Sequence, residues 1–521
     1  MFFLEFSKNG QIFKWPINFS YLPMNNVLLA KPFHIETGAI NIAVLNAEQA
    51  KDMDIKHLDR VLIKSGKKSV ICSVDITNIS VKKGEVGLFV EPWNKLGLKA
   101  SENVTLETVP KPASMDFIRA KLDGAELSKE DIYTIVNDIV NDALTDVELT
   151  AFITSSYCKG LSMEEAYWLT RAMVDTGEVL DVGKGPIFDK HSIGGVPGNR
   201  VTILLVPIVT STGLKMPKTS SRAITSPAGT ADTVEVFCPV TLTKKKMEEM
   251  VRTIGGCMAW GGSFNLAPAD DKIIKVEKPL SIDAEGQMLS SIMAKKISVG
   301  ATHVLVDLPM GPGTKIPTHE RAEELSEKFT RLGEKLGLKV YCIVDNGSQP
   351  CGNGVGPALE ARDVLKILQN DPTGPADLLD KALLFAGTIL ELGGKAKKGK
   401  GQDLALEIIK NGKAYEQFKR IVKAQGGNPN ISLCDIKVGP EMFDVKSEVE
   451  GMITMINNNL ISKCARAAGA PHNQGAGVYV IGKLSMNIKK GTTLMTIYAE
   501  SAEKLERAKE AIKGKEPFVI Q

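Results

Sequence analysis

The chain has 521 residues, of which 43% are hydrophobic and 24% are charged, and this composition excludes an intrinsically disordered protein. Its 64 basic and 61 acidic residues nearly cancel, so the net charge of +3 excludes a global field that would hold nucleic acid or an anionic membrane. A chain of this length is too long for one ordinary core, and about three or four domains are expected.

Residues 1–110 are predicted to form a separate β-rich domain. Short runs rich in β-branched residues, such as 60–66 and 69–76, alternate with turn residues in this part of the chain. A plausible linker follows at 109–112, where two prolines stand close together.

From about residue 115 to 180 the apolar period becomes helical. Residues 130–144 follow Ser128 with acidic residues in the first turn, and Ser162 with Glu165 has the sequence pattern of a capping box. We expect an all-α lobe here, joined by a returning helical segment near 285–300.

Residues 181–430 are predicted to form an α/β lobe with a mainly parallel sheet. Near-continuous apolar runs at 201–209, 302–309 and 338–345 are typical of parallel strands that helices cover on both faces. Helical stretches such as 319–337 alternate with these runs, as the α/β class requires.

Residues 431–521 become β-rich again and end with a predicted helix at 501–512. This pattern predicts a C-terminal α+β domain. The expected fold class is therefore a multidomain α/β protein with an N-terminal β domain, an all-α lobe, an α/β lobe and a C-terminal α+β domain.

The cysteines and histidines argue against disulfides and a dedicated metal site. The eight cysteines are scattered without a C-x-x-C pair, which indicates free thiols in a reducing compartment. The six histidines lack the spacing of a zinc site. Residues 1–16 lack the pattern of a signal peptide, and no apolar window is long enough for a membrane span. We expect a cytoplasmic protein without a metal.

Two loops rich in glycine and hydroxyl side chains flank the apolar run 201–209. In the first loop, residues 189–200, several glycines allow tight turns whose N–H groups face an anion, while Lys190 adds a charge and Ser192 a hydroxyl. In the second loop, residues 218–235, many Ser and Thr surround Arg222, a residue type that holds phosphate with two parallel hydrogen bonds. Two such loops so close in sequence predict a phosphate site rather than ordinary turns.

Several motifs, in the same order, resemble the thymidine and pyrimidine-nucleoside phosphorylase family. The first loop is similar to its K-H-S-x-G-G-V phosphate loop, and residues 289–301 are similar to its S-I-[LM]-x-K-K helix. The second loop is similar to the family signature at the following positions: Ser220, Arg222, Gly229, Thr230, Asp232 and Glu235. The resemblance runs from about residue 30 to the C-terminus and is closest to the AMP phosphorylase branch.

The resemblance implies which residues form the site. The expected phosphate ligands are Lys190, Ser192, Gly194, Ser220 and Thr230. The expected nucleotide contacts are Gly195, Ser221, Arg222, Ala223, Ile224, Thr225, Ser226, Thr230, Ser291, Lys295 and Lys315. Asp283 would donate a proton. His191 has two open interpretations, as a group that exchanges protons with phosphate or stabilises charge, and as a neutral side chain that orients the loop.

The implied activity is cleavage of the N-glycosidic bond of AMP, with CMP and UMP as further substrates, by inorganic phosphate as the co-substrate. The products would be the free base and ribose 1,5-bisphosphate. A departing adenine needs protonation, which a carboxyl with a raised pKa can supply, and this is the expected role of Asp283.

Rival functions remain open at this point. The nearest alternative is a thymidine or uridine phosphorylase that gives a base and a (deoxy)ribose 1-phosphate. Residues 273–283 lack the arginine with which pyrimidine-nucleoside enzymes read the base, and this argues against that specificity. Further rivals are a Mg²⁺-dependent phosphoribosyltransferase and a non-enzymatic nucleotide sensor.

The resemblance also implies a homodimer, or a larger homo-oligomer, formed through the α lobe. The expected partners are a nucleoside or nucleoside monophosphate and phosphate, without nucleic acid, membrane or a cofactor.

Overall fold

The computed structural model describes residues 26–38, 40–223, 226–280 and 282–521. It divides into two compact units. One comprises the residues up to Met115 together with Asn141–Val147, and the other comprises Asp116–Val140 together with Glu148–Gln521. The domain bounds predicted from the sequence stay predictions.

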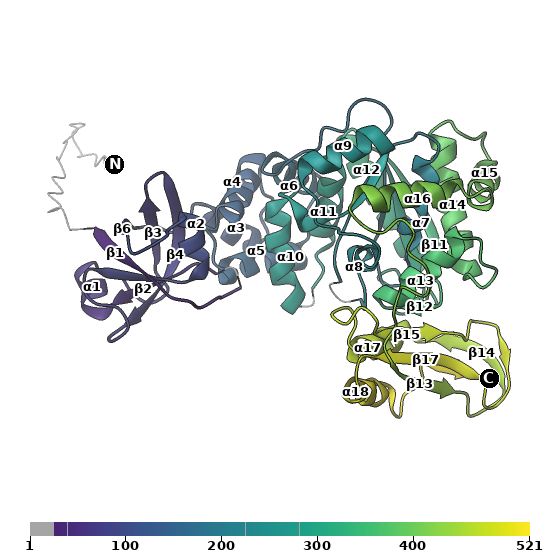
Figure 1. Cartoon of the computed structure of the whole chain (residues 1–521). Coiled ribbons are helices and arrows are strands. Elements are labelled where there is room, and N and C mark those ends of the chain that lie inside the picture. The colour runs from purple at the N-terminus through teal and green to yellow at the C-terminus, as the bar shows by residue number, and fades with distance from the viewer. Residues whose placement is uncertain (1–25, 39, 224–225, 281) are drawn as a thin grey trace. The chain divides into compact units, whose positions relative to one another are not determined.

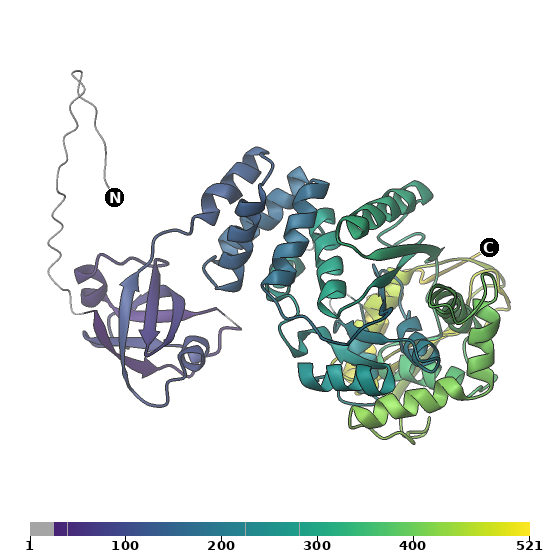
Figure 2. The ribbon, with the colours of Figure 1, turned by 90° about the horizontal axis from the view of Figure 1, so that it is seen from above.

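The first unit contains a closed barrel with the strand order β1-β5-β2-β4-β3-β6, seen in two orientations in Figures 1 and 2. Along β3, buried Val61 and Ile63 alternate with less buried neighbours, as the two-residue period of a barrel strand requires. The elements are β1 (Val27–Pro32), β2 (Ile42–Asn46), α1 (Ala47–Asp52), β3 (Arg60–Ser65), β4 (Lys68–Thr77), β5 (Glu85–Leu88), α2 (Val90–Leu96) and β6 (Asn103–Thr108). The β-rich character predicted for residues 1–110 is thus present in their described part.

A helical lobe follows the barrel in the chain. Its helices are α3 (Ser114–Asp123), α4 (Lys129–Val140), α5 (Asp146–Lys159) and α6 (Met163–Asp175), joined by α10 (Pro268–Leu280) and α11 (Glu285–Ser298). The capping box at Ser162 is confirmed, because its hydroxyl accepts from Glu165 N while the Glu165 carboxylate accepts from Ser162 N. Helix α11 packs against α6, so the helical segment predicted near 285–300 does return to this lobe.

The α/β lobe contains only parallel strand pairs among its described strands. These strands are β7 (Phe188–Ser192), β8 (Met216–Ser220), β9 (Gly256–Trp260), β10 (His303–Met310) and β11 (Lys339–Asn346). They pair in the orders β11-β10-β7 and β8-β9, and a parallel bridge between Ile187 and Lys215 joins the two groups. The predicted parallel sheet is confirmed, including the strands expected at 302–309 and 338–345.

Helices surround this sheet (Figures 1 and 2). They are α7 (Val201–Thr210), α8 (Thr230–Glu235), α9 (Lys244–Ile254), α12 (His319–Lys335), α13 (Pro357–Leu368), α14 (Ala376–Leu392), α15 (Gly401–Lys410) and α16 (Lys413–Ala424), with a short 3₁₀ turn η1 (Gly261–Ser263). Of the helices in the described ranges, none is long and apolar enough to cross a membrane.

The prediction of a strand at 201–209 is wrong, because these residues form helix α7. Every residue of α7 is buried, so the helix has no solvent-facing polar side. A fully buried helix and a fully buried strand show the same unbroken apolar run, and periodicity cannot separate them. The first loop therefore leads from strand β7 into the N-terminus of a helix.

The C-terminal part has its own apolar core and two small sheets. The sheet orders are β12-β15-β17-β13 and β16-β14-β18, and all strand pairs in them are antiparallel. Its elements are β12 (Gly354–Val355), β13 (Glu441–Lys446), β14 (Gly451–Ile456), α17 (Asn458–Ala467), β15 (Gly477–Val480), β16 (Asn487–Ile488), β17 (Thr493–Ala499), α18 (Ala502–Ile512) and β18 (Phe518–Ile520). The predicted mixture of strands and helices is confirmed here.

Candidate active site

The two glycine-rich loops begin at neighbouring strands of the parallel sheet. The first loop leaves the carboxyl end of β7, and the second leaves the carboxyl end of β8. The strands run side by side, since Phe188 N donates to Lys215 O at 2.9 Å. The carboxyl ends of parallel strands meet at one edge of a sheet, where ligands bind in this class of fold. The loops also touch, because Arg200 Nη2 donates to Ala228 O.

Close backbone contacts explain two glycines of the first loop. Gly195 has φ +96°, and a Cβ there would lie 3.1 Å from Thr314 Cα, in the segment between β10 and α12. Gly198 has φ +73°, and a Cβ there would lie 2.6 Å from Cys351 O. Both positions therefore favour glycine by their conformation, and Gly198 also needs it for space. Gly195 lies beside the segment that carries Lys315.

The side chain of Lys190 points into the core rather than into an open loop. Its Nζ lies 2.8 Å from Asp307 Oδ2 on β10, and Asn199 Nδ2 donates to the same oxygen at 3.1 Å. Ser192 stands at the end of β7, and its hydroxyl accepts from Gly194 N at 3.5 Å. The ammonium of Lys190 is thus paired within the protein, and its role as a phosphate ligand stays a prediction.

The residues on either side of Lys190 along β7 face a second set of lysines. Asp189 Oδ2 lies 2.5 Å from Lys296 Nζ, and Asp189 Oδ1 lies 3.2 Å from Lys218 Nζ. Burial, followed by nearby lysines such as Lys296 and Lys218, lowers the pKa of His191 well below its ordinary value. The imidazole is therefore neutral at pH 7. No contact among the described residues distinguishes a role of His191 in catalysis from a role in orienting the loop, so both interpretations stay predictions.

Lys218 was not predicted as a site residue from the sequence. It is buried at the start of the second loop, and burial lowers its pKa to about 7. Its partner Asp189 raises that pKa in part but does not restore it. The only sequence signal was its place before the hydroxyl-rich stretch, because pairing with Asp189 depends on the tertiary structure.

Arg222 is held by acidic residues of its own loop. Its guanidinium bonds both carboxylate oxygens of Glu235, at 2.6 and 2.7 Å, and Asp232 Oδ1 at 3.1 Å. It also lies over the Trp260 ring, 5.2 Å from the centroid. The structure therefore does not leave Arg222 as the open two-pronged phosphate ligand that the sequence predicts.

Helix α8 shapes the rest of the second loop. Asp232 Oδ2 accepts from Ala223 N at 2.7 Å and from Gly229 N at 2.8 Å, and Ser226 Oγ donates to Ala228 O at 2.7 Å. Other predicted residues of this loop have these places: Ser220 ends β8, Ser221 O accepts from Ala231 N, and Thr230 begins α8. Ile224 and Thr225 lie outside the described residues.

Helix α11 carries Ser291 and Lys295 on one face. Lys295 Nζ donates to Ser291 Oγ at 3.3 Å and pairs with Asp270 on α10 at 2.6 Å. The Lys295 side chain is 27% exposed, whereas the neighbouring Lys296 is 2% exposed and pairs with Asp189. Lys295 is the member of the pair on the more open side.

A cavity of about 220 Å³ contains the predicted proton donor. Asp283 and Lys315 both line it and form an ion pair there. Their side chains are 44% and 48% exposed, so a ligand can reach both. The full lining is Ile193, Asp283, Glu285, Met288, Lys315, Arg321 and Leu325.

Glu277 on α10 is a second carboxyl, and no motif in the sequence pointed to it. Burial, and then the neighbouring Asp283 carboxylate, raise its pKa to about 7. A partly buried carboxyl with a raised pKa beside another carboxylate is typical of functional sites.

A second, larger cavity of about 320 Å³ is lined by residues such as Asp345, Asp377 and Lys381. It contains none of the predicted site residues.

Comparison with known proteins identifies three domains in this chain. Residues 115–177 match the helical bundle domain of the glycosyl transferase family, and residues 184–415 match its a/b domain. Residues 452–517 match the pyrimidine nucleoside phosphorylase C-terminal domain.

Curated relatives match over nearly the whole chain. AMP phosphorylase 1 from Archaeoglobus fulgidus is 46% identical over 92% of this chain and 94% of its own length. AMP phosphorylase from Methanosarcina barkeri is 43% identical over 94% of this chain and 96% of its own length.

Among solved structures, anthranilate phosphoribosyltransferase from Thermus thermophilus matches with a TM-score of 0.51 and 20% identity. It covers 60% of this chain and 99% of its own, and at this identity the likeness concerns the fold alone. The domain matches and the curated relatives together decide the family. The chain belongs to the pyrimidine nucleoside phosphorylase family, within its AMP phosphorylase branch.

Proposed function

We propose that the protein cleaves AMP with inorganic phosphate to release adenine and ribose 1,5-bisphosphate. The observation that carries this proposal is the meeting of two loops at one sheet edge, where Gly195 backs onto the segment that bears Lys315. Family membership supports the same reaction, since relatives over nearly the full length are AMP phosphorylases.

Phosphate is expected to act as the nucleophile at C1′ of the ribose. Backbone N–H groups around Gly194 and the hydroxyls of Ser192, Ser220 and Thr230 are the proposed ligands. Holding phosphate next to the sugar lowers the barrier mainly by orientation. The bound dianion also stabilises the positive charge that develops on the ribose as the glycosidic bond stretches.

Asp283 is the proposed acid that protonates the departing base. In the structure its carboxylate forms an ion pair with Lys315. A nucleotide phosphate that binds Lys315 would take this partner away and free Asp283 to hold a proton. Substrate binding would thereby prepare the acid that the reaction needs.

The direct test measures base release from AMP, CMP, UMP, adenosine, uridine and thymidine, with and without phosphate. We expect phosphate-dependent release from AMP, with CMP and UMP as further substrates. Turnover of unphosphorylated pyrimidine nucleosides alone would favour a thymidine or uridine phosphorylase, and equal release without phosphate would exclude phosphorolysis.

Two controls separate the other rivals. A chelator should leave phosphorolysis intact, because the proposed reaction uses phosphate as a co-substrate and needs no cofactor. A Mg²⁺-dependent phosphoribosyltransferase would lose activity. Nucleotide binding without any turnover would indicate a sensor. We also propose a homodimer or larger homo-oligomer, and sedimentation of the purified protein would reveal a monomer if this is wrong.

A further inference from the structure

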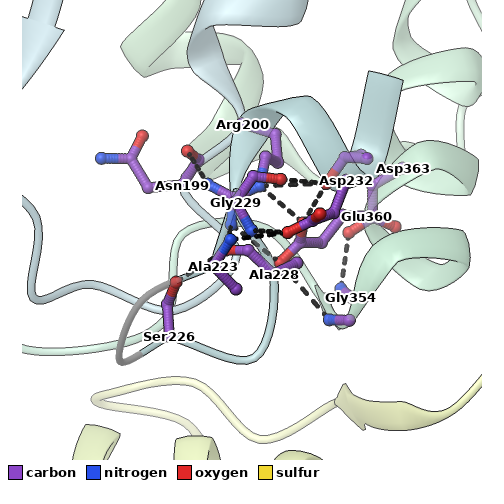
Figure 3. A network of polar contacts seen from close by, with 12 residues as sticks. Asn199, Arg200, Ala223, Ser226, Ala228, Gly229, Asp232, Gly354, Glu360 and Asp363 are labelled. Atoms are coloured by element: carbon purple, nitrogen blue, oxygen red, sulfur yellow. Dashed lines mark hydrogen bonds and ion pairs between the residues drawn. The ribbon is translucent and has the colours of Figure 1, made fainter. Parts of the chain in front are cut away.

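A buried arginine joins the two loops to a third segment of the α/β lobe (Figure 3). Arg200, the last residue of the first loop, is 7% exposed. Its Nη2 donates to Ala228 O in the second loop, and its Nη1 donates to Asn199 O at 2.8 Å. Its Nε donates to Glu360 Oε2 on α13 at 2.5 Å. One rigid guanidinium therefore contacts the end of the first loop, the second loop and α13.

The Glu360 carboxylate holds this guanidinium in place. It is 1% exposed, and Thr233 on α8 donates its hydroxyl to Oε2 at 2.6 Å. Gly356 N donates to Oε1 at 3.3 Å, and Arg200 Nη2 reaches the same oxygen at 3.3 Å. Both carboxylate oxygens are thus paired, and neither the arginine nor the glutamate is left without partners.

Stability alone is a weak reason for such a pair. Taking both charges out of water costs about as much as their attraction returns, so a well-packed apolar replacement is often equally stable. The geometry gives a better reason, because the planar fork of arginine fixes the positions of several acceptors at once.

The described residues on either side of Ala228 are held closely together. Ala228 O also accepts from Ser226 Oγ, and Gly229 N next to it donates to Asp232. A Cβ at Gly229 would lie 2.4 Å from Ser221 O, so the described ends of the loop are folded directly onto each other. A shift of the Ala228 carbonyl would therefore move Ser221 and Thr230 with it.

We propose that Arg200 is a positioning residue that, held by Glu360 and Thr233, sets the distance between the two loops that bind phosphate and nucleotide. This inference rests on the proposed function. Arg200 acts through the Ala228 carbonyl and needs no contact with the substrate.

The test variant is Arg200→Lys, which keeps the charge beside Glu360 but has one compact ammonium in place of the fork. We expect the KM for phosphate to rise about tenfold and kcat to change by less than about threefold, as after the loss of one charge-assisted hydrogen bond. The KM for AMP should rise in parallel, because the same loop is proposed to bind the nucleotide.

The matched control is Lys121→Arg, which exchanges the cation of another buried ion pair. Lys121 Nζ on α3 lies 2.7 Å from Glu165 on α6, and both side chains are buried. This control should lower the melting temperature as much as Arg200→Lys does, with both KM values unchanged. Wild-type KM values in Arg200→Lys would overturn the proposal and leave Arg200 a purely stabilising residue.

A milder pair of variants decides the question if Arg200→Lys does not fold. Thr233→Val removes the hydroxyl that accepts from Arg200 Nε at 3.2 Å and donates to Glu360, and Thr233→Ser keeps it. We expect a roughly threefold higher KM for phosphate in Thr233→Val and wild-type behaviour in Thr233→Ser. Equal KM values in both variants would overturn the proposal. A wild-type enzyme without phosphate-dependent turnover would instead refute the proposed function.

Discussion

Two groups of charged side chains in and around the candidate active site differ in their access to solvent. Asp189 and Asp307, on β7 and β10, have 0% exposed side chains and pair with buried lysines. Asp283 and Lys315 are about half exposed and line a cavity. A buried charge that loses its partner is strongly destabilised, whereas an exposed pair can exchange its partner for a ligand at little cost. The first group is therefore expected to hold the fold, and the second to carry the chemistry.

The largest expected effect is on catalysis, at Asp283. Asp283→Asn should lower kcat for AMP about 10²–10⁴-fold, the usual range for loss of a general acid. The melting temperature should stay within about 2 °C of wild type, because the side chain is half exposed. Steady-state kinetics and calorimetry measure the two quantities on the same sample.

A matched control is Asp175→Asn in the helical lobe. Asp175 is also exposed and paired, with Arg171 at 3.2 Å. It should leave kcat unchanged. Activity within a few-fold of wild type in Asp283→Asn would show that the cavity pair is not the catalytic one.

The next effect is on stability, at Asp307. Asp307→Asn leaves Lys190 and Lys381 without their shared carboxylate and should lower the free energy of unfolding by about 3–5 kcal/mol. Denaturant titration measures this loss. A loss below about 1 kcal/mol would contradict the assignment of this group to the fold.

The same carboxyl should make the protein sensitive to acid. Although burial would raise the pKa of Asp307, Lys190 and Lys381 hold it below its ordinary value. The folded state therefore binds this proton less readily than the unfolded state, so its contribution is present above about pH 4 and is lost as the pH falls. The difference in stability between wild type and Asp307→Asn should shrink below about pH 4.

A smaller effect is expected on binding, at Lys315. Lys315→Met should raise the KM for AMP about tenfold or more, because a charge-assisted hydrogen bond to the nucleotide is lost. Lys335→Met is a suitable control, since Lys335 is similarly exposed and also pairs with one carboxylate, Glu164. An equal rise of KM in both variants would mean that net charge, not the cavity pair, attracts AMP.

The smallest effect concerns Glu277, a partly buried carboxyl that lies near the exposed Asp283. Its pKa of about 7 exceeds its ordinary value of 4.5, so the folded protein holds a proton that the unfolded chain releases. This contribution to stability is complete below about pH 4.5 and is lost as the pH rises through about 7. Glu277→Gln should therefore melt about 1–3 °C above wild type at pH 8 and equally at pH 4. An equal difference in melting temperature between the two proteins at pH 4 and pH 8 would show that the pKa of Glu277 is not raised.

The sequence alone was sufficient for the family and for the main classes of structure. The motifs at residues 189–200, 218–235 and 289–301 are continuous stretches of sequence, so they can be recognised without knowing which distant residues they contact. The capping box at Ser162 and the strand at 302–309 were predictable for the same reason, because both depend on neighbouring residues.

Only the tertiary structure decided the conformation of residues 201–209 and which charged side chains are paired within the protein. The run 201–209 is a helix that the sequence pattern could not reveal, because all its sides are buried. Arg222 is engaged by Glu235 through the fold of its own loop. Arg200 and Glu360 are 160 residues apart, so their pairing appears only when α7 and α13 are placed together. Sequence spacing reports local geometry, whereas the partner of a buried charge depends on which distant elements pack beside it.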